Sequence, residues 1–371
     1  MSELQQQQRV MSSAYMHWAK TQTPAPYNLA TSGVNHYPLE SLRVSLSDLE
    51  LSGTSGYGYP PLQQAIAAKC GVAHDTVVAA NGTSMANFLA LAALLAPGDE
   101  VLVEQPAYEL ILSAALYLGA AVKRFARPSE HGFRLDPSEV ERAITPRTRL
   151  VVVTNLHNPS NAYAGDEVLK QIGDTAARVG ARVLVDEVYL DAACARAPRT
   201  AFHLGEHFIS TSSLTKVYGL SGLRCGWILA APALAERMWR LNDLFGVAQP
   251  HAAERLSCIA FARLHEIAAD ARALLEQNRA LANDFLATRD DLETFPITDG
   301  MISFPRLLTG NVDALCALLR EKYETSLVPG RFFEMPGHFR LSIGNDTETL
   351  RGGLERLGAA LDEFRGRSKG R

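Results

Sequence analysis

The 371-residue sequence has few cysteines, no block of a single charge and no long apolar run. Its five cysteines are odd in number, far apart and without a C-x-x-C pair, which argues against a disulfide framework and against a zinc site. His203 and His207 are four residues apart, as two metal ligands on a helix could be, but no third ligand is near them, so no metal site is expected. The formal net charge is −4 with no basic cluster, so nothing attracts the chain to nucleic acid or to an anionic membrane. No apolar segment reaches the ~20 residues of a membrane span. Chemistry on small molecules remains as the default function.

The N-terminal ten residues are rich in glutamine and lack the apolar core of a signal peptide. With the unpaired cysteines, this predicts a cytoplasmic protein. The length and the 47% hydrophobic content suffice for two domains with a substantial core, since domains usually have roughly 100–200 residues.

Short apolar strands alternate with helices through the first two thirds of the chain. The expected strands cover residues 76–80, 100–104, 121–125, 150–154, 182–186, 207–211 and 225–230. This alternation predicts an α/β fold: a wound, mostly parallel seven-stranded sheet with helices on both faces.

After about residue 232 the sequence becomes mainly helical, with one long helix expected over 266–292 and short strands after it. This change predicts a second, smaller α+β domain. We expect an N-terminal arm with part of the small domain over 1–43, a large domain over 44–264 and a small C-terminal domain over 265–371.

Lys216 lies among small hydroxyl residues and glycines in the segment 212–224. A lysine amine can form an imine with a carbonyl cofactor, and poor solvation lowers its pKa so that the neutral nucleophile exists near pH 7. Ser213 and Arg224 offer a hydroxyl and a guanidinium fork, which suit a phosphate. The segment 81–84, Asn-Gly-Thr-Ser, begins a helix after a strand, where backbone N–H groups attract an anion. A surface lysine beside a turn and an ordinary capped helix are the structural alternatives.

Two further charged residues stand where a ligand is expected. Asp186 ends a buried strand, and open α/β sheets bind ligands at the carboxyl ends of their strands. Such an aspartate can instead only cap a helix. Arg340 lies in a strand-like run near the C-terminus, where a buried charge needs a partner, and a substrate carboxylate would be one.

The order of these motifs resembles that of the class I/II aminotransferases, which are pyridoxal 5'-phosphate (PLP) enzymes of fold-type I, the aspartate aminotransferase-like fold. The resemblance runs from about residue 31 to residue 344 and implies PLP as the cofactor, bound to Lys216 as an aldimine. By the same resemblance, the phosphate is contacted by Gly82, Thr83, Ser84, Ser213 and Arg224.

The resemblance also assigns the cofactor ring. Asp186 matches the aspartate that pairs with the pyridine nitrogen, Tyr189 the tyrosine that bonds the phenolate oxygen, and Tyr108 the aromatic residue that stacks on the ring. Asn158 matches the asparagine that bridges cofactor and substrate. Its turn departs from the family's Asn-Pro-Thr-Gly, but asparagine tolerates a left-handed backbone, so we expect Asn161 to replace the glycine.

On the substrate side, the resemblance implies that Arg340 grips the α-carboxylate, with Asn158 and Gly33 beside it. Tyr57 resembles the tyrosine that reaches the phosphate of a neighbouring subunit, which implies a homodimer with shared active sites; Tyr59 is the alternative.

The implied function is transfer of the amino group of an amino acid to a 2-oxo acid, with Lys216 moving the proton. The same residues would serve a decarboxylase, a β-lyase or a biosynthetic cyclase. A non-catalytic PLP-binding regulator is the alternative from another class. Apart from Arg340 and Arg224, no arginine lies in a motif suited to a second carboxylate, so a substrate with a neutral or mildly polar side chain is expected.

Overall fold

The computed structural model describes residues 10–23, 25–34, 36–53 and 56–369. Its largest element is a seven-stranded sheet with the strand order β2-β8-β7-β6-β5-β3-β4. The strands are β2 (Val77–Asn81), β3 (Glu100–Gln105), β4 (Ala121–Ala126), β5 (Thr148–Thr154), β6 (Arg182–Asp186), β7 (Phe208–Ser213) and β8 (Cys225–Leu229). Only β8 runs antiparallel to its neighbours, so the predicted mostly parallel sheet is confirmed.

Helices cover both faces of this sheet, because side chains along each buried strand point alternately to the two faces. Leu184 of β6 packs towards one layer and its neighbours Val183 and Val185 towards the other. The first layer is α4 (Gly82–Leu94), α5 (Glu109–Tyr117) and α8 (Pro232–Asn242). The second layer is α3 (Pro60–Cys70), α6 (Pro137–Ala143), α7 (Asp166–Arg178) and α9 (His251–Ala262).

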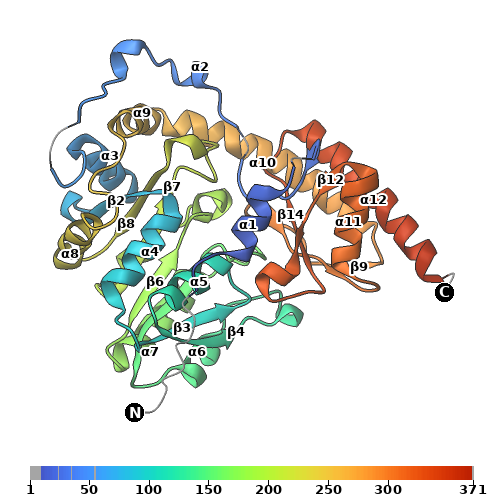
Figure 1. Cartoon of the computed structure of the whole chain (residues 1–371), viewed down its shortest axis with the longest axis horizontal. Helices are drawn as coiled ribbons and strands as arrows, with labels where there is room; N and C mark the ends of the chain where they lie inside the picture. The colour runs from blue at the N-terminus through green and yellow to red at the C-terminus, as the bar shows by residue number, and fades with distance from the viewer. Residues whose placement is uncertain (1–9, 24, 35, 54–55, 370–371) are drawn as a thin grey trace.

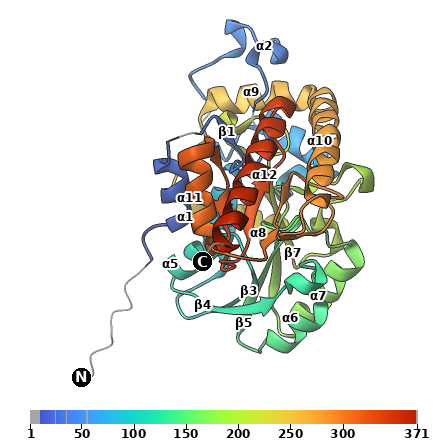
Figure 2. The ribbon, with the colours of Figure 1, turned by 90° about the vertical axis from the view of Figure 1, so that its right-hand side faces the viewer.

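The long helix α10 (Leu264–Ala287) leads from α9 into the C-terminal part of the molecule (Figure 1). There it packs with α12 (Thr347–Lys369), which also contacts α11 (Val312–Tyr323), as Figure 2 shows. The strands here are short: β9 (Leu292–Glu293), β10 (Ile302–Ser303), β11 (Arg306–Leu307), β12 (Thr325–Ser326), β13 (Val328–Pro329) and β14 (Phe339–Ser342). This arrangement matches the expected α+β texture, and the domain boundaries stay a prediction.

The N-terminal segment crosses between the two parts. Helix α1 (Ala14–Thr21) lies between the large sheet and the C-terminal elements (Figure 1), and β1 (Tyr27–Asn28) pairs in parallel with β12. The start of α1 is held by Glu109, whose carboxylate accepts hydrogen bonds from Ser13 Oγ at 2.8 Å, Ala14 N at 2.9 Å and Tyr15 N at 2.7 Å. A carboxylate is favourable there because it meets unpaired N–H groups and the positive end of the helix dipole.

Helix α2 (Leu39–Leu42) belongs to an arm that projects from the molecule in both views (Figures 1 and 2). Beyond it, Leu46 and Leu51 are 88% and 89% exposed. In the part of the chain that the structure describes, no helix combines the length and the apolarity needed to cross a membrane.

Candidate active site

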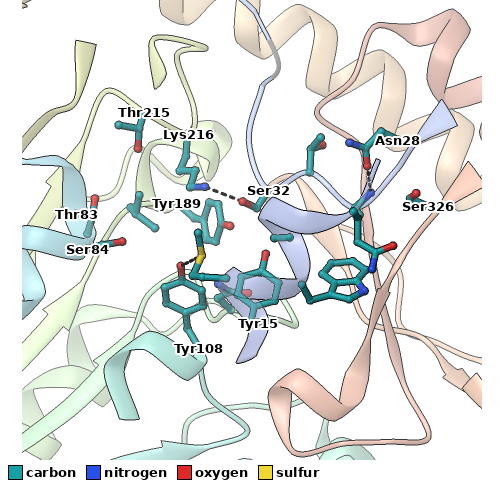
Figure 3. Close-up of a pocket in the computed structure, with 18 of the residues that line it drawn as sticks. Tyr15, Asn28, Ser32, Thr83, Ser84, Tyr108, Tyr189, Thr215, Lys216 and Ser326 are labelled. Carbon is teal, nitrogen blue, oxygen red and sulfur yellow. Dashed lines mark hydrogen bonds between the residues drawn. The ribbon is translucent and has the colours of Figure 1, made fainter. Parts of the chain in front are cut away.

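A cavity of about 380 Å³ opens at the carboxyl ends of the parallel strands, with α1 forming one wall (Figure 3). The position agrees with the rule that open α/β sheets bind ligands at this edge. Eight residues named from the sequence line it: Thr83, Ser84, Tyr108, Asn158, Asp186, Tyr189, Lys216 and Arg224. Gly33, Gly82, Ser213 and Arg340 lie directly behind this lining and contact it.

Lys216 follows β7, and its amine points across the cavity to donate a hydrogen bond to Ser32 Oγ at 2.7 Å (Figure 3). Burial lowers the pKa of Lys216 to about 8, helped by the positive charges of Arg340 and Arg224. A substantial neutral fraction is therefore present near neutral pH, as nucleophilic and base chemistry requires. Ser32 was not named from the sequence.

Gly33 brings the N-terminal segment against this lysine. Val34 N donates to the carbonyl oxygen of Lys216 at 2.8 Å, and a Cβ on Gly33 would lie 2.9 Å from the same oxygen. Any larger residue would push the segment away, so Gly33 shapes the site through its backbone.

Asp186 ends β6 and is only 4% exposed. Its carboxylate accepts hydrogen bonds from Asn87 Nδ2 at 2.7 Å and from Val188 N at 3.0 Å. Burial nevertheless raises the pKa of Asp186 to about 6. Asn87 is held in turn by the Thr211 hydroxyl, which donates to Asn87 Oδ1 at 2.6 Å. The sequence interpretation missed Asn87, although a lone amide in the apolar helix α4 was the available signal.

Two tyrosines complete the middle of the cavity (Figure 3). Tyr189 is 1% exposed, and burial raises the pKa of its phenol to about 12. Tyr108 precedes α5, and burial raises the pKa of its phenol as well. Both hydroxyls therefore stay protonated at physiological pH as hydrogen-bond donors, and that of Tyr108 donates weakly to Met16 Sδ at 3.8 Å.

At one end of the cavity, hydroxyl groups from two chain segments meet. Thr83 Oγ1 donates to Ser213 Oγ at 2.8 Å, and Ser213 Oγ lies 2.6 Å from Thr215 Oγ1. The guanidinium of Arg224 stands beside them over Gly82, where a Cβ would lie 2.3 Å from Arg224 Nη2. Hydroxyls, a helix start and a guanidinium are groups that could hold a phosphate here.

Arg340, in β14, is 1% exposed. Its Nη1 donates to Asn158 Oδ1 at 3.0 Å and its Nη2 to the Tyr15 hydroxyl at 2.8 Å. Its buried Nε has no hydrogen-bond partner among the described residues. Tyr15, brought by α1, was not named from the sequence, because nothing in so short a segment indicates where its helix docks.

The turn after Asn158 follows the expectation for its departure from the family pattern. Asn161 has φ 67°, the left-handed conformation predicted for it. Its side-chain amide donates to Asp299 O at 3.0 Å and also to Ile302 O, which ties the turn to the C-terminal part of the molecule. Asparagine thus supplies both the backbone conformation and a contact with the C-terminal part of the molecule.

Tyr57 does not reach the cavity of its own chain. It is 52% exposed, and its hydroxyl donates to Asp243 Oδ2 at 3.2 Å. Tyr59 instead packs edge-on against His251, with ring centroids 4.9 Å apart. A role for either at a partner's phosphate remains a prediction.

The donor set fits PLP: a buried lysine of lowered pKa, a buried aspartate and a cluster of hydroxyl and guanidinium donors share one cavity. Fold and site together define a PLP-dependent enzyme of fold-type I. The chain belongs to the class I and II aminotransferases, because the family model matches residues 28–357. PLP is the cofactor of this family.

Individual relatives differ in their named activity. The chain is 29% identical to capreomycidine synthase of Streptomyces vinaceus, over 93% of this chain and 92% of the relative. It is 28% identical to aspartate aminotransferase of Streptomyces avermitilis, over 84% and 81% of the two chains.

Solved structures confirm the fold. A PLP-dependent aminotransferase from Streptococcus suis superposes with a TM-score of 0.90 at 25% identity, covering 96% of this chain and 98% of the other. The PLP-dependent cyclase OrfR gives a TM-score of 0.87 at 24% identity, covering 98% and 100%.

Proposed function

We propose that the protein is an aminotransferase that moves the amino group of an amino acid to a 2-oxo acid. The observation that carries the proposal is the convergence of Lys216, Asp186 and Arg340 around one cavity. The similarity to the S. avermitilis aspartate aminotransferase supports the same reaction type.

Bound PLP supplies an electron sink for the charge left when the substrate Cα loses its proton. The Lys216 amine, with its pKa of about 8, accepts that proton and then donates it to the cofactor. Without substrate, the amine donates a hydrogen bond to Ser32 Oγ. Asp186 would supply the buried negative charge that a protonated ring nitrogen needs. Tyr189 offers a phenolic donor to the ring oxygen.

Arg340 binds the substrate α-carboxylate through its guanidinium fork, with Asn158 beside it. Because Tyr15 OH already accepts from Arg340 Nη2, the carboxylate replaces or joins this hydroxyl. Orientation by the fork sets which Cα bond faces the lysine.

The assembly we propose is a homodimer with shared active sites. The projecting arm carries the exposed Leu46 and Leu51, a pattern that suits burial against another copy. Tyr57, exposed and outside its own cavity, is then free to reach the partner's phosphate.

A second candidate is another PLP reaction on an amino acid, including a ring-forming one. The similarity to capreomycidine synthase over 93% of the chain favours this candidate. The same lysine, aspartate and arginine serve both reactions, so the product distinguishes them.

A single-turnover experiment tests the proposal. Holoenzyme mixed with amino acids, without any 2-oxo acid, is expected to release one 2-oxo acid per site and to keep the amino group on the cofactor. Release of carbon dioxide or ammonia, or formation of a cyclised amino acid, with the cofactor unchanged would select the second candidate. If no amino acid changes the absorbance spectrum of the bound cofactor, the protein is instead a non-catalytic PLP-binding protein.

Gly82→Ala is expected to weaken PLP binding by about 10- to 100-fold, the loss that follows when one charge-assisted hydrogen bond is removed. The added Cβ would lie 2.3 Å from Arg224 Nη2 and displace the guanidinium. The measurement is the dissociation constant of PLP from a fluorescence titration.

Gly180→Ala is the matched control for this variant. Gly180 has φ +74°, close to the +75° of Gly82, but a Cβ there meets no atom within 4 Å. Both variants bear the same backbone strain, so only Gly82→Ala should affect the cofactor. Equal PLP affinities in the two variants would show that Arg224 does not bind the phosphate.

A further inference from the structure

The far end of the cavity carries a cation that the proposed reaction does not use. Arg320, near the end of α11, lines the cavity together with Trp18, Gln22, Asn28 and Ser326. Figure 3 shows Asn28 and Ser326 on the side of the cavity away from Lys216. This end therefore faces the substrate's side chain rather than the cofactor.

Among the described residues, Arg320 has only neutral hydrogen-bond partners. Its Nη1 donates to Ser326 Oγ at 2.9 Å and its Nη2 to the carbonyl oxygen of Thr23. Within the described ranges, it forms no ion pair with an acidic side chain, unlike its neighbour Lys322, which pairs with Glu363 at 2.6 Å. A half-buried guanidinium without a counter-charge attracts an anion, because burial limits the solvent's screening of its field.

The charges of the cavity point the same way. Asp186 is the one carboxylate among the described lining residues, against Lys216, Arg224 and Arg320. In the proposed reaction, Arg224 faces the phosphate, Asp186 the ring nitrogen and Arg340 the α-carboxylate. Arg320 then has no assigned role in the proposed reaction. No acidic group of the described lining remains to bind a cationic side chain.

We propose that the preferred substrate is an amino acid whose extended side chain ends in an anionic group, a carboxylate or a phosphate, bound by Arg320. This inference rests on the proposed aminotransferase function and narrows its substrate class. It differs from the expectation of a substrate with a neutral side chain. That expectation was based on sequence motifs, which do not indicate that Arg320 lines the cavity.

Three substrates of similar length test the charge preference: L-2-aminoadipate, L-norleucine and L-lysine, with anionic, neutral and cationic ends. In single-turnover assays of the holoenzyme, kcat/KM is expected to be at least about 10-fold higher for aminoadipate than for norleucine, and lowest for lysine. O-phospho-L-homoserine forms the phosphate arm, and its rank against aminoadipate identifies the kind of anion. Equal rates for norleucine and aminoadipate, or a preference for lysine, would overturn the inference.

Arg320→Gln should bring aminoadipate and norleucine to within about twofold of each other, whereas Arg320→Lys should keep part of the preference. Lys322→Gln removes a neighbouring positive charge of α11 that pairs with Glu363 and does not line the cavity, so its preference should match that of the unaltered protein. An equal loss for all three substrates in Arg320→Gln would show a structural role only.

A binding measurement separates this inference from the reaction itself. Calorimetric titration of the holoenzyme with adipate and with hexanoate compares a distal carboxylate with a methyl group without any turnover. Adipate should bind about 10-fold more tightly, and Arg320→Gln should abolish the difference. If no amino acid reacts but adipate is preferred, the proposed reaction fails and the anion site stands; if amino acids react but adipate and hexanoate bind alike, the anion site fails alone.

Discussion

Lys216→Ala is expected to remove catalysis and the visible absorbance of the lysine-bound cofactor while leaving the protein folded. Loss of a positioned proton-transfer group alone costs on the order of 10²–10⁴-fold in rate, and here the covalent attachment point disappears too. Within the described part of the chain, the amine donates one hydrogen bond, to Ser32 Oγ, so truncation disturbs little of the surrounding structure. The measurements are the absorbance spectrum after addition of PLP, single-turnover kinetics and circular dichroism.

Lys69→Ala provides a matched control, because Lys69 is also largely buried but lies outside the cavity. Its amine pairs with Asp191 at 3.0 Å and lies 5.8 Å from the centroid of the Trp227 ring. This variant should lose stability and keep the spectrum. Borohydride reduction that still attaches PLP covalently to the Lys216→Ala protein would show that another lysine holds the cofactor.

Arg340→Ala should weaken transition-state binding of α-amino acids by about 2–5 kcal/mol, the range for removing one member of a buried charge pair. The side chain is 1% exposed and offers a fork whose donors now face Asn158 and Tyr15. The measurement is kcat/KM for an amino acid, compared between variant and parent. Arg340→Lys should recover only part of the loss, since an ammonium cannot form two parallel hydrogen bonds.

An amine that lacks the carboxylate is the internal control for Arg340. It cannot use the guanidinium, so its slow reaction should be the same in parent and variant. A loss of similar size for both compounds would mean that Arg340 acts by holding Tyr15 and Asn158 in place.

The sequence predicted the sheet and the residues at its edge, because local pattern determines both. Alternating strands and helices require a wound sheet, and Asp186 at the end of a buried strand could only face that edge. The turn at Asn161 was predictable for the same reason, since backbone preference is local.

Residues delivered by distant segments were not predictable. Tyr15 and Ser32 reach the cavity because α1 and the segment after β1 dock between the two parts of the molecule, and no periodicity encodes this docking. Arg320 was not predicted as a site residue, because a basic residue in the last turn of a helix such as α11 is common and needs no ligand to explain it. The bounds of the short strands expected after the long helix were not predictable either, since β10 is only Ile302–Ser303 and the loop before it follows tertiary contacts such as those of Asn161.

Because Asp186 is buried, we expect the cofactor to stabilise the folded protein in addition to its role in the reaction. Its pKa of about 6 in the folded state exceeds its ordinary value of 3.8, so the cofactor-free fold keeps a proton that the unfolded chain releases. As pH rises from about 4 to about 6, the cofactor-free fold loses stability, by about 3 kcal/mol at most, and the deficit persists above that range. A protonated ring nitrogen beside the carboxylate offsets this deficit. The cofactor should therefore raise the melting temperature more at pH 8 than at pH 4, which links retention of the fold to the supply of the cofactor.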